Sequence, residues 1–389
     1  MNNIKVNAHL HTPYSFSAFD DVSDSLDRAL SENVKVVGIN DFYTTAGYEE
    51  WYKGCKERHL YPLFNIEFIS LNENDQKNGL RVNDPGNPGR TYISGKGLRY
   101  PFSLSEPYAT QLSEVRKKSN EQVRAMCIKL NELLDANSIC FSLDFDWITK
   151  ELTKGAIRER HLAKALRMKV YEVAENDESI IKEILQKLFN DVALKALPAN
   201  IADVENEIRG NLLKAGGPAF VPEESDAFLS VDAVSKIILN AGGIPTYPFL
   251  ADDKNGNYTD FENDLERVAT ELKERGFYSV EFITTRNGVE LLEKYAEYLY
   301  DAGFVVTFGS EHNSPTMEPI ELFARNKTPL TNKLLKINYE GACVIAAHQH
   351  LVSEGKQGYL DKDGNADPSK MKCFIEIGDE LIQKKVELK

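Results

Sequence analysis

The sequence predicts an α/β fold, a barrel-like sheet of seven strands that is interrupted by a helical insertion. Three observations lead to this prediction. Strand and helix patterns alternate before residue 105 and again after residue 225, and a long stretch with helical periodicity separates the two parts. Polar residues also follow several of the predicted strands at their C-terminal ends, which is the edge at which parallel barrels carry their active sites.

Four strands are expected before the insertion. Residues 5–11 form a short β-type run, and residues 34–41 are β-branched and mostly apolar, as in a strand buried on both faces. Residues 62–71 and 90–98 give the third and fourth strands, with a loop rich in Gly, Pro and Asn between them. Helices are expected between the first three strands, over residues 22–32 and 48–58.

The central part of the chain has the periodicity of helices rather than strands. Between residues 106 and 211 apolar side chains recur at spacings of three and four. The spacing is clearest at Leu112, Val115, Val123, Met126, Leu130, Leu133 and Leu134. We therefore expect a barrel built from residues 1–104 and 225–345, a helical insertion over 105–224, and a C-terminal extension, 346–389, that packs on the barrel.

Three more helix–strand units are expected after the insertion. Helical segments at 230–241, 260–276 and 288–303 run into strands at 242–249, 277–283 and 304–312. Because a helix precedes each of these strands, the pattern implies a parallel sheet with right-handed crossovers. Seven strands in such units favour a closed barrel over an open sheet.

The composition excludes several classes of function. The chain has 389 residues, a formal net charge of −14 and no apolar run long enough to cross a membrane. The acidic balance argues against general nucleic-acid binding, and a small anionic substrate would need a local basic pocket. Five scattered cysteines and an N-terminus without the pattern of a secretory signal indicate a cytoplasmic protein. The sequence does not indicate an oligomeric state.

The first predicted strand ends in His9-Leu10-His11. Residues on either side of a single position point the same way along a strand, so the two imidazoles make half of a metal site. Two polar residues on a solvated strand face would give the same triplet. The metal interpretation is favoured because Asp41, Glu67 and the pair Glu311-His312 also stand at or near the C-terminal ends of predicted strands.

These segments resemble the polymerase and histidinol phosphatase (PHP) family, metal-dependent phosphoesterases with a distorted seven-stranded TIM-like (β/α) barrel. HLHTPYS is similar to the first motif of the family, VVGINDF to its strand ending in TDH, FNIEFIS to its GIE motif and VVTFGSEHN to its closing TxGSDxH. RERHLAKAL, GGPAFVPEE and AGGIPTYPF resemble stretches of the subgroup that hydrolyses nucleotide phosphates. The resemblance implies the family's fold and a trinuclear metal centre.

Only one of the three metal positions implied by the resemblance keeps its ligands. The first would use His9, His11, Glu67 and Glu311, a set suited to zinc, manganese or iron(II). The second would share Glu67, but its imidazoles are replaced by phenols, and the third has two phenyl groups and an amide in place of its ligands. The substituted positions are Tyr92 and Tyr247 in the second site and Phe16, Phe42 and Asn313 in the third. We therefore expect about one divalent metal ion per chain.

Four further residues complete the candidate site. His312 could turn inward as a replacement ligand, although neighbours on a strand usually face opposite sides. Asp41 is a candidate catalytic residue that would orient a ligating imidazole, and the alternative is a helix N-cap. Arg160 and His161 begin a helix, where backbone N–H groups and cationic side chains suit a phosphate, and the resemblance makes His161 a substrate-binding or proton-donating residue. The alternative is a solvated helix start.

Three other polar clusters are given less weight. Lys96 and Arg99 could contact an anion, but we favour an exposed loop for both. His348 and His350 have helical surroundings that make their imidazoles diverge. The acidic segment 361–367 lacks the spacing of a calcium loop, and a β-turn explains it better.

The favoured function is a metal-dependent hydrolase that acts on a phosphate ester of a small metabolite or nucleotide. The alternative is a ligand-binding protein on a catalytically degenerate barrel, which the aromatic residues at lost ligand positions would suit. Metal-assisted hydrolysis at carbon, such as deamination, is a third possibility.

Overall fold

The computed structural model describes residues 4–224, 227–253 and 256–386. Seven strands form one sheet in the order β1-β2-β3-β4-β6-β7-β8, and a short strand β5 pairs with β3. Their bounds are β1 Lys5–Leu10, β2 Val34–Phe42, β3 Tyr61–Leu71, β4 Arg90–Lys96, β5 Leu229–Ser230, β6 Ile244–Phe249, β7 Ser279–Ile283 and β8 Val305–Gly309. The main strands match the seven that the sequence predicts.

The sheet closes into a barrel where the end of β8 meets β1. The backbone N–H of His11 donates to the carbonyl of Glu311 at 2.7 Å, and the N–H of Glu311 donates to the carbonyl of His9 at 3.0 Å. A side chain at Gly309 would not fit there, because a Cβ would lie 2.2 Å from the Cβ of His9. The predicted fold class, a seven-stranded TIM-like barrel with a helical insertion, is confirmed.

The sheet is not wholly parallel, and this part of the prediction is wrong. β4 runs antiparallel to both β3 and β6, with Ser94 opposite Glu67 on one side and Thr246 on the other. The cause is the connection between β3 and β4, which contains only the five-residue helix α3, Glu73–Lys77. Without a full crossover helix the chain reverses direction, as it does in a hairpin.

Helices cover the outside of the barrel through amphipathic faces. In α1, Val22–Ser31, the residues Val22, Leu26 and Ala29 are buried, and Asp21 caps the helix by accepting from the backbone N–H of Asp24. The other surrounding helices are α2 Tyr48–Glu57, α9 Val231–Asn240, α10 Leu265–Glu274 and α11 Val289–Asp301. Their buried faces and the outward side of the strands form the main hydrophobic core.

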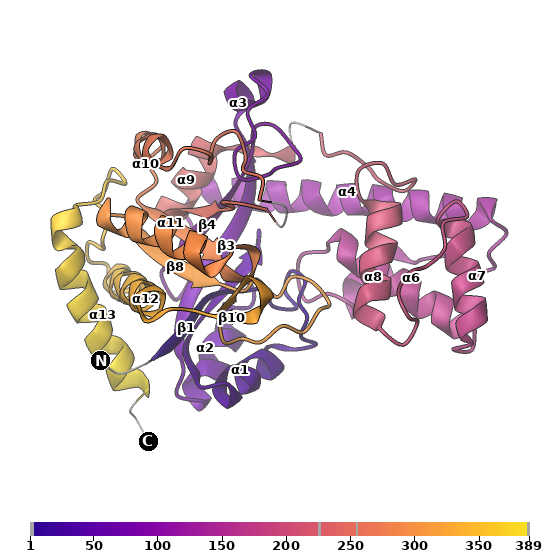
Figure 1. The fold of residues 1–389 in the computed structure, drawn as a ribbon, viewed down its shortest axis with the longest axis horizontal. Helices are drawn as coiled ribbons and strands as arrows, with labels where there is room; N and C mark the ends of the chain where they lie inside the picture. The colour runs from indigo at the N-terminus through magenta and orange to yellow at the C-terminus, as the bar shows by residue number, and fades with distance from the viewer. Residues whose placement is uncertain (1–3, 225–226, 254–255, 387–389) are drawn as a thin grey trace.

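The central helices form a module with a hydrophobic core of its own, seen at the right of Figure 1. Its elements are α4 Tyr108–Ala136, α5 Phe145–Glu151, α6 Glu159–Val173, α7 Glu178–Leu188, α8 Ile201–Ile208 and η1 Arg209–Leu213. α4 joins the two bodies, because Val115 is buried in the barrel core whereas Leu130 and Leu134 are buried in the module. The expected boundary at 225 lies outside the described residues.

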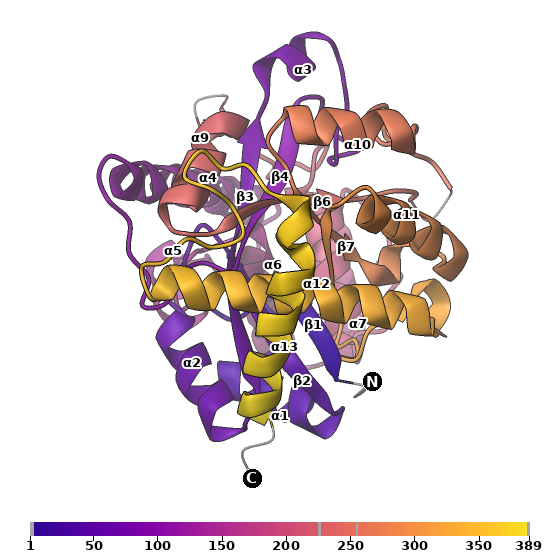
Figure 2. The same cartoon turned by 90° about the vertical axis from the view of Figure 1, so that its left-hand side faces the viewer.

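The C-terminal helices close the end of the barrel that lies opposite the helical module (Figure 1). α12, Asn332–Ser353, and α13, Met371–Val386, pack together across the face turned to the viewer in Figure 2. Gln349 ties α12 to β3, since its side chain accepts from the N–H of Phe64 and donates to the carbonyl of Pro62. The boundary expected at residue 345 falls within α12. In the part of the chain that the structure describes, no helix is long and apolar enough for a membrane span.

The two histidines of α12 have different surroundings, as their helical spacing predicts. His350 is partly exposed, with Nε2 3.4 Å from Glu354. His348 is buried, donates from Nε2 to the carbonyl of Gly242 at 2.6 Å, and accepts at Nδ1 from the N–H of Tyr359 at 2.9 Å. Burial lowers the pKa of His348 to about 4.

This burial makes the stability of the fold depend on pH. We expect the free energy of unfolding to fall as the pH drops from about 6.5 to about 4, because His348 takes up a proton in the unfolded chain before it does so in the fold. The contribution of this residue is on the order of 3 kcal/mol. Urea unfolding of the wild type and of His348→Gln at pH 7.5 and 4.5 measures it. An equal loss of stability in both proteins would contradict the prediction.

Candidate metal centre and anion pocket

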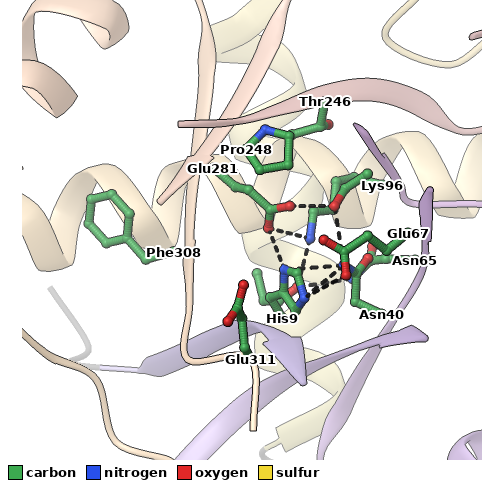
Figure 3. Close-up of polar contacts among 12 residues, drawn as sticks. His9, Asn40, Asn65, Glu67, Lys96, Thr246, Pro248, Glu281, Phe308 and Glu311 are labelled. Carbon is green, nitrogen blue, oxygen red and sulfur yellow. Dashed lines mark hydrogen bonds and ion pairs between the residues drawn. The ribbon is translucent and has the colours of Figure 1, made fainter. Parts of the chain in front are cut away.

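Three buried side chains converge at the C-terminal ends of β1 and β3. Nε2 of His9 lies 3.2 Å from Nε2 of His11, and Oε2 of Glu67 lies 3.1 Å from Nε2 of His11 and 3.8 Å from Nε2 of His9. These three atoms form a cluster with the composition and spacing of a metal site. Figure 3 shows His9 and Glu67 pointing toward each other inside the barrel.

The partners of His9 fix which of its nitrogens can bind a metal. Nδ1 lies 3.0 Å from Oε2 of Glu281, a carboxylate that also pairs with Lys96 at 2.6 Å. Burial favours the neutral form of Glu281, but Lys96 and His9 outweigh it and hold the pKa of this carboxyl well below its usual range. Because Glu281 is an anion, we assign the imidazole proton to Nδ1, which leaves the lone pair of Nε2 for the cluster or for the amide N–H of Asn40, whose nitrogen lies 3.0 Å away.

His11 is held in the same tautomer by a different chain of hydrogen bonds. Its Nδ1 lies 3.1 Å from Oγ of Ser15, and the Ser15 hydroxyl donates to Asp41 at 2.6 Å. The hydroxyl oxygen therefore accepts from Nδ1–H, and Nε2 of His11 again presents a lone pair. Asp41 also accepts from the N–H and the hydroxyl of Thr12, so it orients the imidazole through Ser15. It does not cap α2, whose N-cap is Gly47.

The cluster fits a divalent cation. Oε2 of Glu67 is buried and has no hydrogen-bond partner among the described residues. Burial raises the pKa of Glu67 to about 8, so without a cation this carboxyl holds a proton at neutral pH. Two imidazole lone pairs and a carboxylate that meet within 4 Å repel one another unless a proton or a metal ion lies among them.

The other two predicted ligands contact different partners. Both oxygens of Glu311 accept from Nη2 of Arg286, at 2.8 and 2.9 Å. His312 stacks on Phe19, lies 2.8 Å from the Ser310 hydroxyl through Nδ1, and donates from Nε2 to the carbonyl of Glu318 at 2.8 Å. Both residues have positive φ angles, 64° and 57°, in the tight turn after β8. His312 is turned away from His9 and His11 as a result.

A cavity of about 430 Å³ opens above the cluster, between the barrel and the helical module. Glu67 and Glu311 lie in its wall together with Phe16, Phe42, Tyr92 and Asn313, four of the five substituted ligand positions. The sequence predicts that Tyr247, the fifth, lies at the metal site, but its side chain does not face the cavity. Its hydroxyl donates to Glu262 at 2.7 Å, while the next residue, Pro248, lines the cavity because successive strand residues point to opposite faces.

Basic side chains from the module and the barrel surround this cavity. They are Arg90, Arg158, Arg160, Arg209, Lys214 and Arg286. Arg90 and Arg209 are neutralised by Glu223 and Glu159 at 2.9 and 2.7 Å. Arg160 lies 5.7 Å from the ring centre of Phe16 and donates to Asn206, so this predicted residue is in the cavity wall. The same wall contains the carboxyl groups of Glu67, Asp84, Glu159, Glu223 and Glu311, so the positive charges exceed the negative ones only slightly. The pocket still offers N–H donors to an anion in a chain whose net charge is −14.

His161 is close to the cavity but does not line it. Its Nδ1 accepts from the backbone N–H of Arg158 at 2.9 Å, which caps the start of α6, and its ring packs edge-on against Phe16 at 4.9 Å. Burial lowers the pKa of His161 to about 3, so the imidazole is neutral at physiological pH. The predicted role of His161 as a proton donor has no support in this arrangement.

Lys96 is fully buried in the barrel, so the exposed loop expected for it is wrong. The reason is the antiparallel direction of β4, which carries Lys96 away from the open end of the barrel and toward Glu281. Arg99 follows β4 and is not part of the cavity wall. Sequence reasoning also missed Glu281 and Arg286. A lone carboxylate in the apolar strand FYSVEFI was the signal that could have revealed Glu281.

Two solved structures resemble this chain along most of its length. One is described as a "putative metal-dependent phosphoesterase" from Bifidobacterium adolescentis, with a TM-score of 0.56, 16% identity, and coverage of 86% of this chain and 95% of that chain. The other is an amidohydrolase from Chromobacterium violaceum solved with bound sulfate and no metal, with a TM-score of 0.55, 17% identity, and coverage of 86% and 96%. At this identity the likeness shows a shared barrel fold. No protein-family model and no curated protein matches the chain.

Proposed function

We propose that this protein is a metal-dependent hydrolase of the PHP family that acts on a phosphate ester of a small metabolite or nucleotide. One observation carries the proposal. Two imidazole lone pairs and a buried carboxylate converge beneath a cavity whose wall contains five arginines and a lysine. A metal-ligand cluster and a basic pocket in the same place suit the binding and hydrolysis of an anionic ester.

In this proposal His9, His11 and Glu67 hold one zinc, manganese or iron(II) ion. Such an ion polarises a phosphoryl oxygen and acidifies a bound water. The chain itself orients and encloses the substrate. Glu281 and Asp41 keep the two imidazoles in the ligating tautomer, Arg158 and Arg160 bind anionic oxygens, and the helical module limits the access of bulk water to the cavity.

The descriptions of the two similar structures support the hydrolase class. One is described as a phosphoesterase and the other as an amidohydrolase, so the fold accommodates attack at phosphorus or at carbon. The cationic wall favours a phosphate ester over a neutral amide. All five cysteines lie in the described part of the chain and none is paired there, which suits the cytoplasmic location we propose.

A phosphate-release assay tests this function. Protein dialysed against chelator is supplied in turn with zinc, manganese and iron(II), and incubated with nucleoside monophosphates, sugar phosphates and an aryl phosphate. We expect release of inorganic phosphate that depends on the metal. Tight binding of a phosphorylated compound without turnover would instead favour the alternative, a ligand-binding protein on a degenerate barrel. If the metal-loaded protein hydrolyses only amides or amidines, the reaction takes place at carbon and not at phosphorus.

A further inference from the structure

Arg286 is a cation of the cavity that the sequence analysis did not identify. It ends the turn η3, Thr284–Arg286, directly after β7, and its side chain lies in the cavity wall with 42% of its surface exposed. Only Nη2 is occupied, by the two oxygens of Glu311. Among the described residues, Nε and Nη1 of Arg286 form no hydrogen bond, so three N–H donors remain for a ligand.

The backbone of this turn is held rigidly. The side chain of Arg325 donates to the carbonyl of Arg286 and pairs with Asp252 at 3.1 Å. The neighbouring Asn287 is buried and donates to the carbonyls of Leu250 and Asp252 at 3.0 and 3.1 Å. Arg286 therefore projects from a fixed point, as a residue that binds a ligand should.

Arg286 shares the cavity wall with two residues of the second metal position that the family resemblance implies. Glu67 would be shared by that position, Tyr92 replaces one of its imidazoles, and both lie in the cavity wall with Arg286. The charge of Glu311 raises the pKa of Arg286 and outweighs the opposite effect of burial. A guanidinium and a divalent cation compete for the same carboxylates and the same space.

The third metal position shows the same replacement of metal charge by arginine. Phe42 stands where an imidazole was expected, and the guanidinium of Arg158 lies 4.7 Å from the centre of its ring. Phe16 stands at another lost ligand, with the guanidinium of Arg160 5.7 Å from its centre. Both phenylalanines of the third position are thus accompanied by a guanidinium at cation–π distance.

We propose that Arg286, anchored by Glu311, replaces the second metal ion and binds an oxyanion of the ligand beside the ion at His9, His11 and Glu67. Glu311 is then the anchor of a guanidinium and not a metal ligand. The inference rests on the proposed function for the identity of the anion. It does not depend on turnover, because a bound phosphate contacts Arg286 whether or not the ester bond is broken.

The test measures metal content and phosphate affinity in the same protein samples. Wild type, Arg286→Met, Arg286→Lys and Glu311→Gln are loaded with zinc, dialysed, and analysed for metal by elemental analysis. Inorganic phosphate is then titrated into each sample by calorimetry, with and without metal. Arg81→Met, which removes a surface arginine paired with Asp260, is the matched control. Thermal unfolding identifies any variant that does not fold.

We expect Arg286→Met to bind phosphate about 10- to 100-fold more weakly, since charge-assisted bonds are lost. Arg286→Lys should recover part of the affinity, and Arg81→Met should match the wild type. Glu311→Gln should keep its metal but bind phosphate more weakly. Unchanged phosphate affinity in Arg286→Met would overturn the proposal, and so would loss of metal from Glu311→Gln, which would make Glu311 a ligand. Failure of the hydrolase proposal is seen separately, as absence of turnover in the wild type.

Discussion

Replacement of His9 by alanine should abolish both metal binding and hydrolysis. His9 contributes one of the three donors that converge among the described residues, and two donors are too few to repay the dehydration of a divalent ion. Loss of the ion removes several kcal/mol of charge stabilisation from the transition state, so the rate should fall by on the order of a thousandfold or more. Metal content by elemental analysis and phosphate release by the wild type and variant are the measurements.

Two further variants make this result specific. Glu67→Gln keeps the volume of the side chain but removes the anionic donor, and it should lose metal and activity together. His350→Ala removes a histidine that is partly exposed on α12 and should change neither. Activity that survives in both His9→Ala and Glu67→Gln would come from another site or another protein. If these variants have a normal metal content but no activity, His9 and Glu67 are not metal ligands.

The sequence predicts the strands and their ends better than the direction in which they run. Alternation and β-branched runs locate all seven barrel strands within a few residues. The direction of β4 could not be deduced, because a loop with a short helix and a true crossover look alike in composition. Tyr92 still reaches the cavity, since the beginning of an antiparallel β4 lies beside the C-terminal ends of its neighbours.

Errors in the candidate site come from side-chain direction rather than from residue type. Tyr247 and Pro248 differ by one position, and a shift of one residue along a strand reverses the face. His312 follows a residue with positive φ, and the turn points its imidazole to Phe19. Such directions depend on local backbone geometry that no residue pattern records.

The pairing of distant charges was also beyond the sequence. Glu281 and Lys96 are far apart in the chain, and only the closed barrel places them against each other and against His9 (Figure 3). A buried Lys–Glu pair costs desolvation energy, so its presence beneath the cluster is better explained by the control of His9 than by stability. The pairing of Arg286 with Glu311 could not be predicted from the sequence either, because it depends on where β7 ends relative to Glu311.

Purified protein should contain about one equivalent of divalent metal per chain after dialysis against a mixture of zinc, manganese and iron(II). His9, His11 and Glu67 offer two imidazoles and a carboxylate with preset lone pairs, which is enough for firm binding. The second position has Tyr92, a phenol whose pKa burial raises, so it is a neutral and weak donor. Pro248, the residue next to Tyr247, also lines the cavity, and its side chain has no donor atom.

The third metal position is even less able to hold an ion than the second. Phe16 and Phe42 have no lone pairs, the amide of Asn313 is a weak donor, and Arg158 and Arg160 repel a cation from the same wall. Elemental analysis of protein purified without chelator measures the stoichiometry, and His9→Ala gives the background. Three equivalents would contradict this assignment of donors. A value near zero would mean that a proton on Glu67, and not a metal ion, relieves the repulsion among the three donor atoms. That result would favour the ligand-binding alternative.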